Sequence, residues 1–220
     1  MLKKIVIVLL LSNLLFSSDE LTGDTKLSCE AILCLSSGTR PSECNPSLNR
    51  YFSINAKKWS DTVKKRKNFL KLCPVDGADE RDETFADLRD NVLPNTDPRQ
   101  CTASYLNSQI ESKRSKSKYN ENFFLSSKVY RVNPNIPSQC NALYRHAYTD
   151  IKKPIYVCTG EFYTKLEWDM NAKLVEISKS EYQTLAVSNR YQIEYQDEYS
   201  TYITYYKKVP FSKTCWQNQN

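Results

Sequence analysis

The sequence predicts an α+β fold in which a disulfide-stapled helical amino-terminal module is followed by a tyrosine-rich, mainly β carboxy-terminal half. Three observations predict this fold. All eight cysteines lie beyond an amino-terminal hydrophobic leader, and their number is even. Helical patterns of apolar residues occupy residues 24–118. Residues 119–220 contain thirteen of the fifteen tyrosines and several β-branched runs, a composition typical of strands.

Residues 1–18 resemble a secretory signal peptide. Lys3 and Lys4 precede an apolar run over residues 5–11, and the small residues Ser17 and Ser18 follow. The run is shorter than the roughly 20 residues that a membrane-spanning helix needs, so we expect no transmembrane span in the mature chain. The chain has no Asn-x-Ser/Thr glycosylation sequon, which favours a bacterial periplasm over a eukaryotic secretory pathway. We expect export to the periplasm rather than to the medium.

Charge and composition exclude several classes of function. Without Lys3 and Lys4 the 31 basic residues become 29, against 25 acidic residues, and this modest excess does not indicate direct binding of nucleic acid. Only four glycines occur, so a phosphate-cradling loop is excluded. No Cys-x-x-Cys motif is present, and His146 is the single histidine. We therefore expect neither a metal site, nor a cofactor, nor a histidine-dependent nucleophile.

The cysteines are expected to form four disulfides, as is usual in an oxidising compartment. They are Cys29, Cys34, Cys44, Cys73, Cys101, Cys140, Cys158 and Cys215. A first helix is expected from Asp24 or Thr25 to about Gly38. Within it Cys29 and Cys34 point about 140° apart, so each needs another partner. Among on the order of a hundred possible connectivities, we expect Cys34 to pair with Cys44, and Cys29 with Cys73.

A second helix is expected over residues 56–72, with an apolar stripe of Trp59, Val63, Phe69, Leu70 and Cys73. The same helix is strongly basic, and its central charged residues are candidate interaction residues. These are Lys64, Lys65, Arg66 and Lys67. They form either a docking surface for an acidic partner or anionic lipid, or simply a solvated outer face.

Residues 76–118 are expected to form acidic and basic helices. A third helix is predicted from Asp79 to Leu93, with carboxylates in its first turn, where the helix dipole favours them. Pro94 should end it. A fourth helix is predicted after Cys101, with Ile110 on its inward face.

Residues 119–220 are predicted to form strands at 155–158, 174–177, 191–195 and 201–206. The tyrosines either present a ligand-binding face or pack as cross-strand pairs with their hydroxyls in water. Cys158 is expected to join Cys215 across this sheet. Cys101 is expected to join Cys140 and so tie the sheet to the helical half.

An enzymatic alternative rests on three carboxylates close to aromatic residues in the second half. Glu161, Glu167 and Asp169 could act as paired carboxylates on a carbohydrate, which would make the protein an envelope enzyme acting on peptidoglycan. Acidic residues near aromatic ones are common on sheets, however. We therefore expect a protein that is not an enzyme.

The segment from Leu21 to Pro74 carries a more specific pattern. It contains Cys29-Glu30-Ala31-Ile32-Leu33-Cys34, then Arg40-Pro41-Ser42-Glu43-Cys44, then Leu48-Asn49-Arg50-Tyr51-Phe52, and reaches Cys73-Pro74. This pattern resembles the TrbM/KikA/MpfK family of conjugal transfer proteins.

The resemblance implies an exported periplasmic accessory of mating-pair formation, associated with a type IV secretion system that moves plasmid DNA. It implies protein partners in the envelope or the secretion channel. Cys29, Cys34, Cys44 and Cys73 would be its framework. Arg40 and Arg50, in the matching segments, either anchor a contact with another protein or hydrogen-bond loop carbonyls inside the module.

Overall fold

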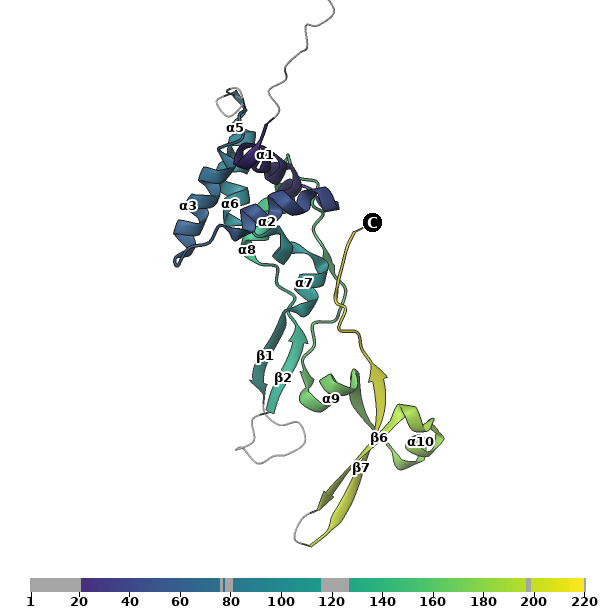
Figure 1. Cartoon of the computed structure of the whole chain (residues 1–220). Coiled ribbons are helices and arrows are strands. Elements are labelled where there is room, and N and C mark those ends of the chain that lie inside the picture. The colour runs from purple at the N-terminus through teal and green to yellow at the C-terminus, as the bar shows by residue number, and fades with distance from the viewer. Residues whose placement is uncertain (1–20, 76, 78–80, 116–126, 197–198, 220) are drawn as a thin grey trace, which may run out of the picture. The chain divides into compact units, whose positions relative to one another are not determined.

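The computed structural model describes residues 21–75, 77, 81–115, 127–196 and 199–219 (Figure 1). The expected signal peptide lies outside the described residues. The chain divides into two compact units, Met1–Asn95 and Thr96–Asn220, and each is described by itself. The α+β class is confirmed, with helices in the first part of the chain and the sheets in the second.

The first unit is built from helices. They are α1 (Gly23–Ser36), a 3₁₀ turn η1 (Ser42–Cys44), α2 (Asn45–Ser53), α3 (Trp59–Leu70), α5 (Glu83–Asp87), a π-helical turn η2 (Leu88–Val92) and α6 (Leu93–Asn95). Helix α2 was not expected. Helix α3 begins three residues later than predicted, because Lys58 is extended and serves as its N-cap residue.

The predicted third helix is divided into α5, η2 and α6, and its first residues, Asp79 and Glu80, lie outside the described part of the chain. Asp82 caps α5 by accepting a hydrogen bond from the backbone N–H of Phe85 at 3.0 Å. Pro94 does not stop the helical path, which continues to Asn95. The π-helical turn widens the backbone just before Pro94, where the proline ring would otherwise meet a carbonyl.

The core of the first unit lies between α1, α2, α3 and the η2–α6 segment. Its most deeply buried apolar side chains are Ala31, Leu35, Tyr51, Leu70 and Leu93. The hydroxyl of Tyr51 donates to the carbonyl oxygen of Leu93 at 2.8 Å, so the buried phenol is satisfied. The disulfides Cys29–Cys73 and Cys34–Cys44 link α1 to the end of the α3 segment and to η1, as expected.

The second unit alternates short helices and strands. The helical elements are η3 (Pro98–Cys101), α7 (Ala103–Ser108), α8 (Ser138–Arg145), α9 (Lys165–Met170), α10 (Lys179–Thr184) and η4 (Val187–Asn189). The strands are β1 (Ile110–Ser115), β2 (Ser127–Val132), β3 (Ile155–Tyr156), β4 (Tyr163–Thr164), β5 (Ala172–Ile177), β6 (Arg190–Gln196), β7 (Thr201–Pro210) and β8 (Trp216–Gln217).

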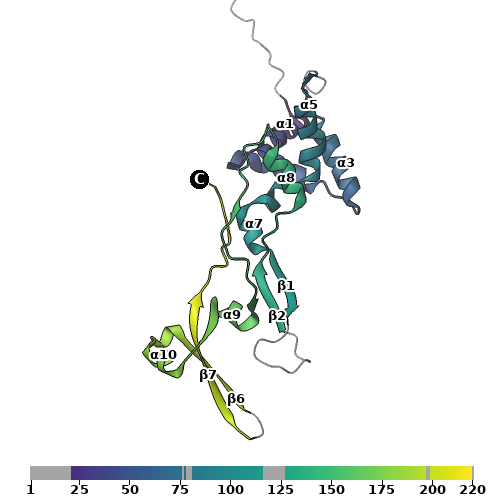
Figure 2. The same cartoon turned by 180° about the vertical axis from the view of Figure 1, so that it is seen from behind.

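The described strands form three antiparallel sheets, ordered β1-β2-β4, β3-β8 and β5-β7-β6. The view from behind shows the β6–β7 hairpin and helix α10 beside it (Figure 2). Strand β1 occupies residues that were predicted to be helical, and Ile110 is 45% exposed rather than inward. It is held by β2, with which it pairs over its whole length.

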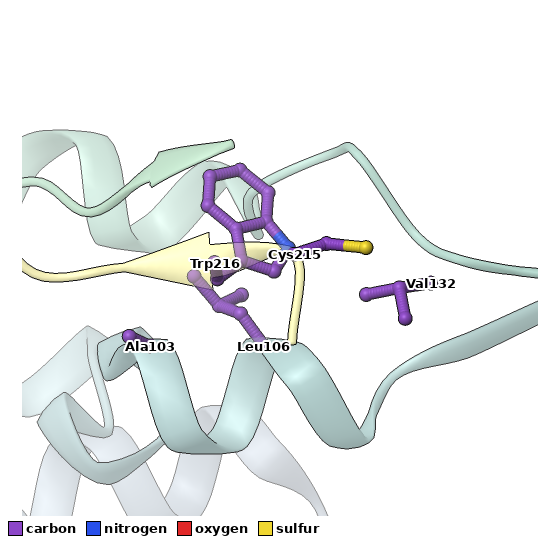
Figure 3. Packing of buried hydrophobic residues seen from close by; sticks show 5 residues of the cluster. All are labelled: Ala103, Leu106, Val132, Cys215 and Trp216. Atoms are coloured by element: carbon purple, nitrogen blue, oxygen red, sulfur yellow. The ribbon is translucent and has the colours of Figure 1, made fainter. Parts of the chain in front are cut away.

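A small core in the second unit joins α7, β2 and β8. Trp216 and Leu106 approach each other, with Ala103, Val132 and Cys215 around them (Figure 3). The side chain of Asn107 binds the last strand with three hydrogen bonds. Its amide donates to the carbonyl oxygen of Trp216 at 2.9 Å, and its oxygen accepts from the N–H groups of Cys215 and Trp216 at 2.7 and 2.8 Å.

The two remaining disulfides also occur as the expected pairs. Cys158–Cys215 links the segment after β3 to β8. Cys101–Cys140 links η3 to α8, and both cysteines belong to the second unit. The bond joins the half that was expected to be helical to the half that was expected to be β, but its second cysteine lies in helix α8 rather than in a strand.

The tyrosines of the β6–β7 hairpin pack across the strands. Tyr195 lies opposite Tyr202 with the rings stacked at 5.0 Å, and Tyr191 lies opposite Tyr206, which is buried. This is the cross-strand arrangement that was one of the two alternatives. Tyr202 remains 53% exposed.

Candidate interaction site: a buried guanidinium among aromatic rings

The loop between α2 and α3 brings aromatic side chains to one face of α3. The hydroxyl oxygen of Thr62 accepts a hydrogen bond from the backbone N–H of Ala56 at 2.9 Å, and Asn55 accepts from the same N–H at 2.9 Å. These bonds fix the loop against the first turn of α3. Phe52 at the end of α2 and Trp59 at the start of α3 are thereby placed near the same part of the helix.

Arg66 lies at the centre of this arrangement and is only 6% exposed. Its guanidinium carbon is 4.9 Å from the ring centroid of Tyr51, 5.4 Å from that of Trp59 and 5.6 Å from that of Phe52. The atoms Nε and Nη1 are buried and have no hydrogen-bond partner. The rings contribute about 0.5–2 kcal/mol each through cation–π attraction. They supply no acceptor, so the buried charge is only partly compensated.

The neighbouring basic residues differ sharply from Arg66. Lys64 and Lys65 are exposed. Lys67 and Lys71 lie 3.4 and 3.2 Å from the carboxylate of Asp90. The predicted basic run therefore has two solvated members, one in an ion pair and one, Arg66, in the interior.

Asp90 is the centre of an ion-pair group on η2. Its carboxylate also accepts a hydrogen bond from Nε of the buried Arg89 at 2.7 Å. Burial by itself would raise the pKa of Asp90, but the hydrogen bonds from Arg89 and Lys71 and the charge of Lys67 outweigh it, so the pKa lies below its ordinary value.

The arginines in the family-like segments have partners inside the first unit. Nε of Arg40 donates to the carbonyl oxygen of Cys34 at 3.1 Å, near the end of α1. Arg50 makes two hydrogen bonds to Asp24, at 3.0 and 2.6 Å, and its guanidinium lies 5.1 Å from the ring centroid of Phe69. The Arg50 hydrogen bond holds the pKa of Asp24 below its ordinary value. Arg40 thus hydrogen-bonds a carbonyl, and Arg50 joins α2 to α1.

The three carboxylates of the enzymatic alternative are engaged separately. Glu161 accepts two hydrogen bonds from Lys173, at 3.1 and 2.9 Å, which raise the pKa of that lysine. Glu167 is buried, forms a capping box with Thr164 and accepts from the N–H of Leu174 at 3.0 Å. Asp169 pairs with Lys165 one turn away on α9.

In the part of the chain that the structure describes, no group of three or more His, Cys, Asp or Glu side chains is placed to hold a metal ion. All eight cysteines are in disulfides. Nδ1 of His146 accepts a hydrogen bond from the backbone N–H of Tyr148 at 3.2 Å. None of the helices described here is long and apolar enough to cross a membrane.

The sequence pattern placed Arg66 in a charged run and did not predict that its side chain is buried among aromatic rings. The signal was present in the spacing, because Thr62, Arg66, Phe69 and Leu70 follow the i, i+4, i+7, i+8 pattern of a buried helix face and all four are buried. The predicted stripe instead included Trp59, which is 54% exposed. The role of Phe52 as a ring beside the guanidinium depends on how α2 packs, which spacing within α3 does not reveal.

The fold and this site define a class: a disulfide-stapled α+β protein whose candidate site is a set of side chains suited to contact with another molecule. A comparison with protein-family models matches residues 20–182 to the TrbM family. The chain therefore belongs to the TrbM family, a family of conjugal transfer proteins. The match extends beyond the amino-terminal segment that carried the resemblance, and it ends within α10. No curated protein and no solved structure matches the chain.

Proposed function

We propose that this protein is an exported periplasmic accessory of conjugative plasmid transfer, acting with a type IV secretion system in mating-pair formation through contacts with other proteins. The observation that carries the proposal is the family match over residues 20–182, which covers most of the chain. Conjugal transfer is the process with which the family is associated, and the finer role is our inference.

The disulfides support a periplasmic location. Four bonds that use every cysteine are expected in an oxidising compartment and are rare in the bacterial cytosol. The side chains around the candidate site support a contact role, because Trp, Tyr and Arg are the residues enriched at the energetic centres of protein interfaces.

A non-enzymatic role is also part of the proposal. It is supported by the separate ion-pair and capping contacts of Glu161, Glu167 and Asp169, each of which explains its carboxylate without a substrate. A cell-wall zymogram with the purified protein tests this point. Clearing that disappears in Glu161→Gln, a change at an exposed carboxylate, would favour the peptidoglycan enzyme instead.

The main test is a clean in-frame deletion in a donor strain that carries the conjugative system. We expect plasmid transfer to fall and to be restored by the full-length gene in trans, while nicking of DNA by the relaxase is unchanged. A complementing gene that lacks codons 2–18 is the matched control, because it supplies the same mature chain without export. Normal transfer by the deletion strain, or full rescue by the leaderless chain, would contradict the proposal.

A further inference from the structure

The strongest unexplained feature of the molecule is the buried guanidinium of Arg66. Its nitrogens Nε and Nη1 are hydrogen-bond donors without an acceptor. The residue is only 6% exposed, so water has little access to them. Two carboxylates of the same unit are already engaged, Asp24 by Arg50 and Asp90 by Lys67, Lys71 and Arg89. A buried charge of this kind is stabilised strongly by an incoming anion that accepts its hydrogen bonds.

The rings around Arg66 differ in how firmly they are held. Tyr51 is fully buried, and its hydroxyl is bonded to Leu93. Trp59 is 54% exposed and is the first residue of α3. Exposed side chains change rotamer on the nanosecond scale, so the indole can move aside and let a side chain reach the guanidinium, whereas the phenol cannot.

The surface around Trp59 carries positive charge. Lys57 and Lys58 directly precede it, and both are exposed. Asp61 is the one acidic residue of α3. The patch formed by Trp59, Arg66 and these two lysines is called the Arg66 patch below. Its charge is complementary to an acidic ligand.

We propose that the Arg66 patch is the docking site for an acidic peptide segment of a partner protein. A glutamate or aspartate of that segment accepts hydrogen bonds from the Arg66 guanidinium, the displaced Trp59 ring covers the contact, and the lysines pair with flanking carboxylates. The proposal names the kind of partner for the accessory role argued above and rests on it for the compartment in which the two proteins meet.

Two other anionic ligands match the Arg66 patch less well. A membrane surface cannot reach a guanidinium that is 6% exposed, whereas one carboxylate on a flexible side chain can. Single-stranded DNA would stack a base on Trp59 and so keep the ring over the Arg66 guanidinium, whereas the contact with a carboxylate needs the ring to move aside. Both become outcomes of the test.

The test measures binding to the purified mature protein with its disulfides intact. The probe is a fluorescein-labelled 12-residue peptide with four glutamates and two leucines, followed by fluorescence anisotropy. Its competitors are the same peptide with glutamine for glutamate, vesicles that contain phosphatidylglycerol, and a single-stranded oligodeoxynucleotide. We expect the acidic peptide to bind at least about tenfold more tightly than the glutamine peptide and to resist displacement by the other two.

Three changes to the protein locate the site. Lys57→Glu/Lys58→Glu should weaken binding by about tenfold or more, whereas Lys152→Glu/Lys153→Glu, the same charge change at exposed lysines of the other unit, should leave it within about twofold. Trp59→Ala changes no charge and should also weaken binding about tenfold.

Arg66→Lys keeps the charge but removes the planar fork, and is expected to weaken binding similarly. Because Arg66 is buried, this variant can also fail to fold, so circular dichroism and disulfide mapping accompany it, and the exposed-residue variants decide the question. Four results would each overturn the proposal. They are equal binding of the glutamine peptide, equal losses in the two lysine pairs, no loss in Trp59→Ala, and preferential binding of vesicles or oligonucleotide. None of these results depends on plasmid transfer, so the two proposals can fail separately.

Discussion

Asn107 is the residue whose removal gives the sharpest test of the second unit. Its side chain makes three hydrogen bonds to β8, and the residues that it binds, Cys215 and Trp216, are 3% and 4% exposed. In Asn107→Ala the two N–H groups and one carbonyl lose their partner with little access to water. A net value of about 1 kcal/mol for each bond gives a loss of about 3 kcal/mol.

Urea unfolding followed by tryptophan fluorescence measures this loss, because Trp216 is a buried reporter in the affected core. With a slope of about 2 kcal/mol/M, the midpoint should fall by about 1.5 M. Asn107→Asp keeps an acceptor for the N–H groups of Cys215 and Trp216 but loses the donor to the Trp216 carbonyl, so its loss should be smaller. Asn135→Ala, an exposed position in the same unit, is the control and should change stability by less than about 0.5 kcal/mol.

Amide hydrogen exchange measures directly whether the Asn107 side chain protects the backbone amides that it accepts from. The N–H groups of Cys215 and Trp216 should exchange faster in Asn107→Ala and stay protected in Asn107→Asp, since only the first loses their acceptor. A midpoint of Asn107→Ala equal to that of Asn135→Ala, or unchanged exchange at these two amides, would refute the reasoning.

Three further predictions follow from single contacts. Tyr51→Phe leaves the buried Leu93 carbonyl without its donor and should cost about 1–3 kcal/mol in urea unfolding; an unchanged midpoint would contradict this. Burial raises the pKa of Tyr144 to about 12. The unfolded chain therefore ionises first, and stability should fall as pH rises from about 10 to 12; Tyr144→Phe should flatten that fall. Arg50→Ala should return the lowered pKa of Asp24 towards its ordinary value in an NMR titration; a pKa that stays low would exclude Arg50 as the cause.

Disulfide pairing was the part of the structure most open to prediction. Within one helix Cys29 and Cys34 cannot reach each other, which directs each to a cysteine beyond the helix end, and the structure pairs them with Cys73 and Cys44. The helical period only excluded a bond between Cys29 and Cys34. The partners were chosen from the turn over residues 38–41, which leads to Cys44, and from the expected end of the second helix at Cys73.

Elements stabilised mainly by distant contacts were missed. Strand β1 has the charged sequence Ile-Glu-Ser-Lys-Arg-Ser, which has little intrinsic strand preference. It is a strand because β2 pairs with it and because Arg131 on β2 forms an ion pair with Glu111 at 2.8 Å. Helix α2 was not predicted, although Pro46 lies in its first turn, where proline is well tolerated.

Arg66 shows a different limit of sequence reasoning. Its position on the buried face of α3 could be read from spacing, but its neighbours could not, because Tyr51 and Phe52 belong to another helix. A charged residue among lysines is normally assigned to the solvent side, and only the packing of α2 against α3 shows that this one lies inside.

The disulfides compensate for the limited apolar content of the chain, of which hydrophobic residues make up 40%. Such a composition supports only small cores, and three of the strands have two residues each. The bonds close loops with sequence separations of 44, 10, 39 and 57 residues. In the chain-entropy view each contributes roughly 3–4 kcal/mol, which together is comparable to the whole stability of a typical domain. Loss of these bonds is therefore expected to destabilise both units, which is the physical argument for the proposed periplasmic location.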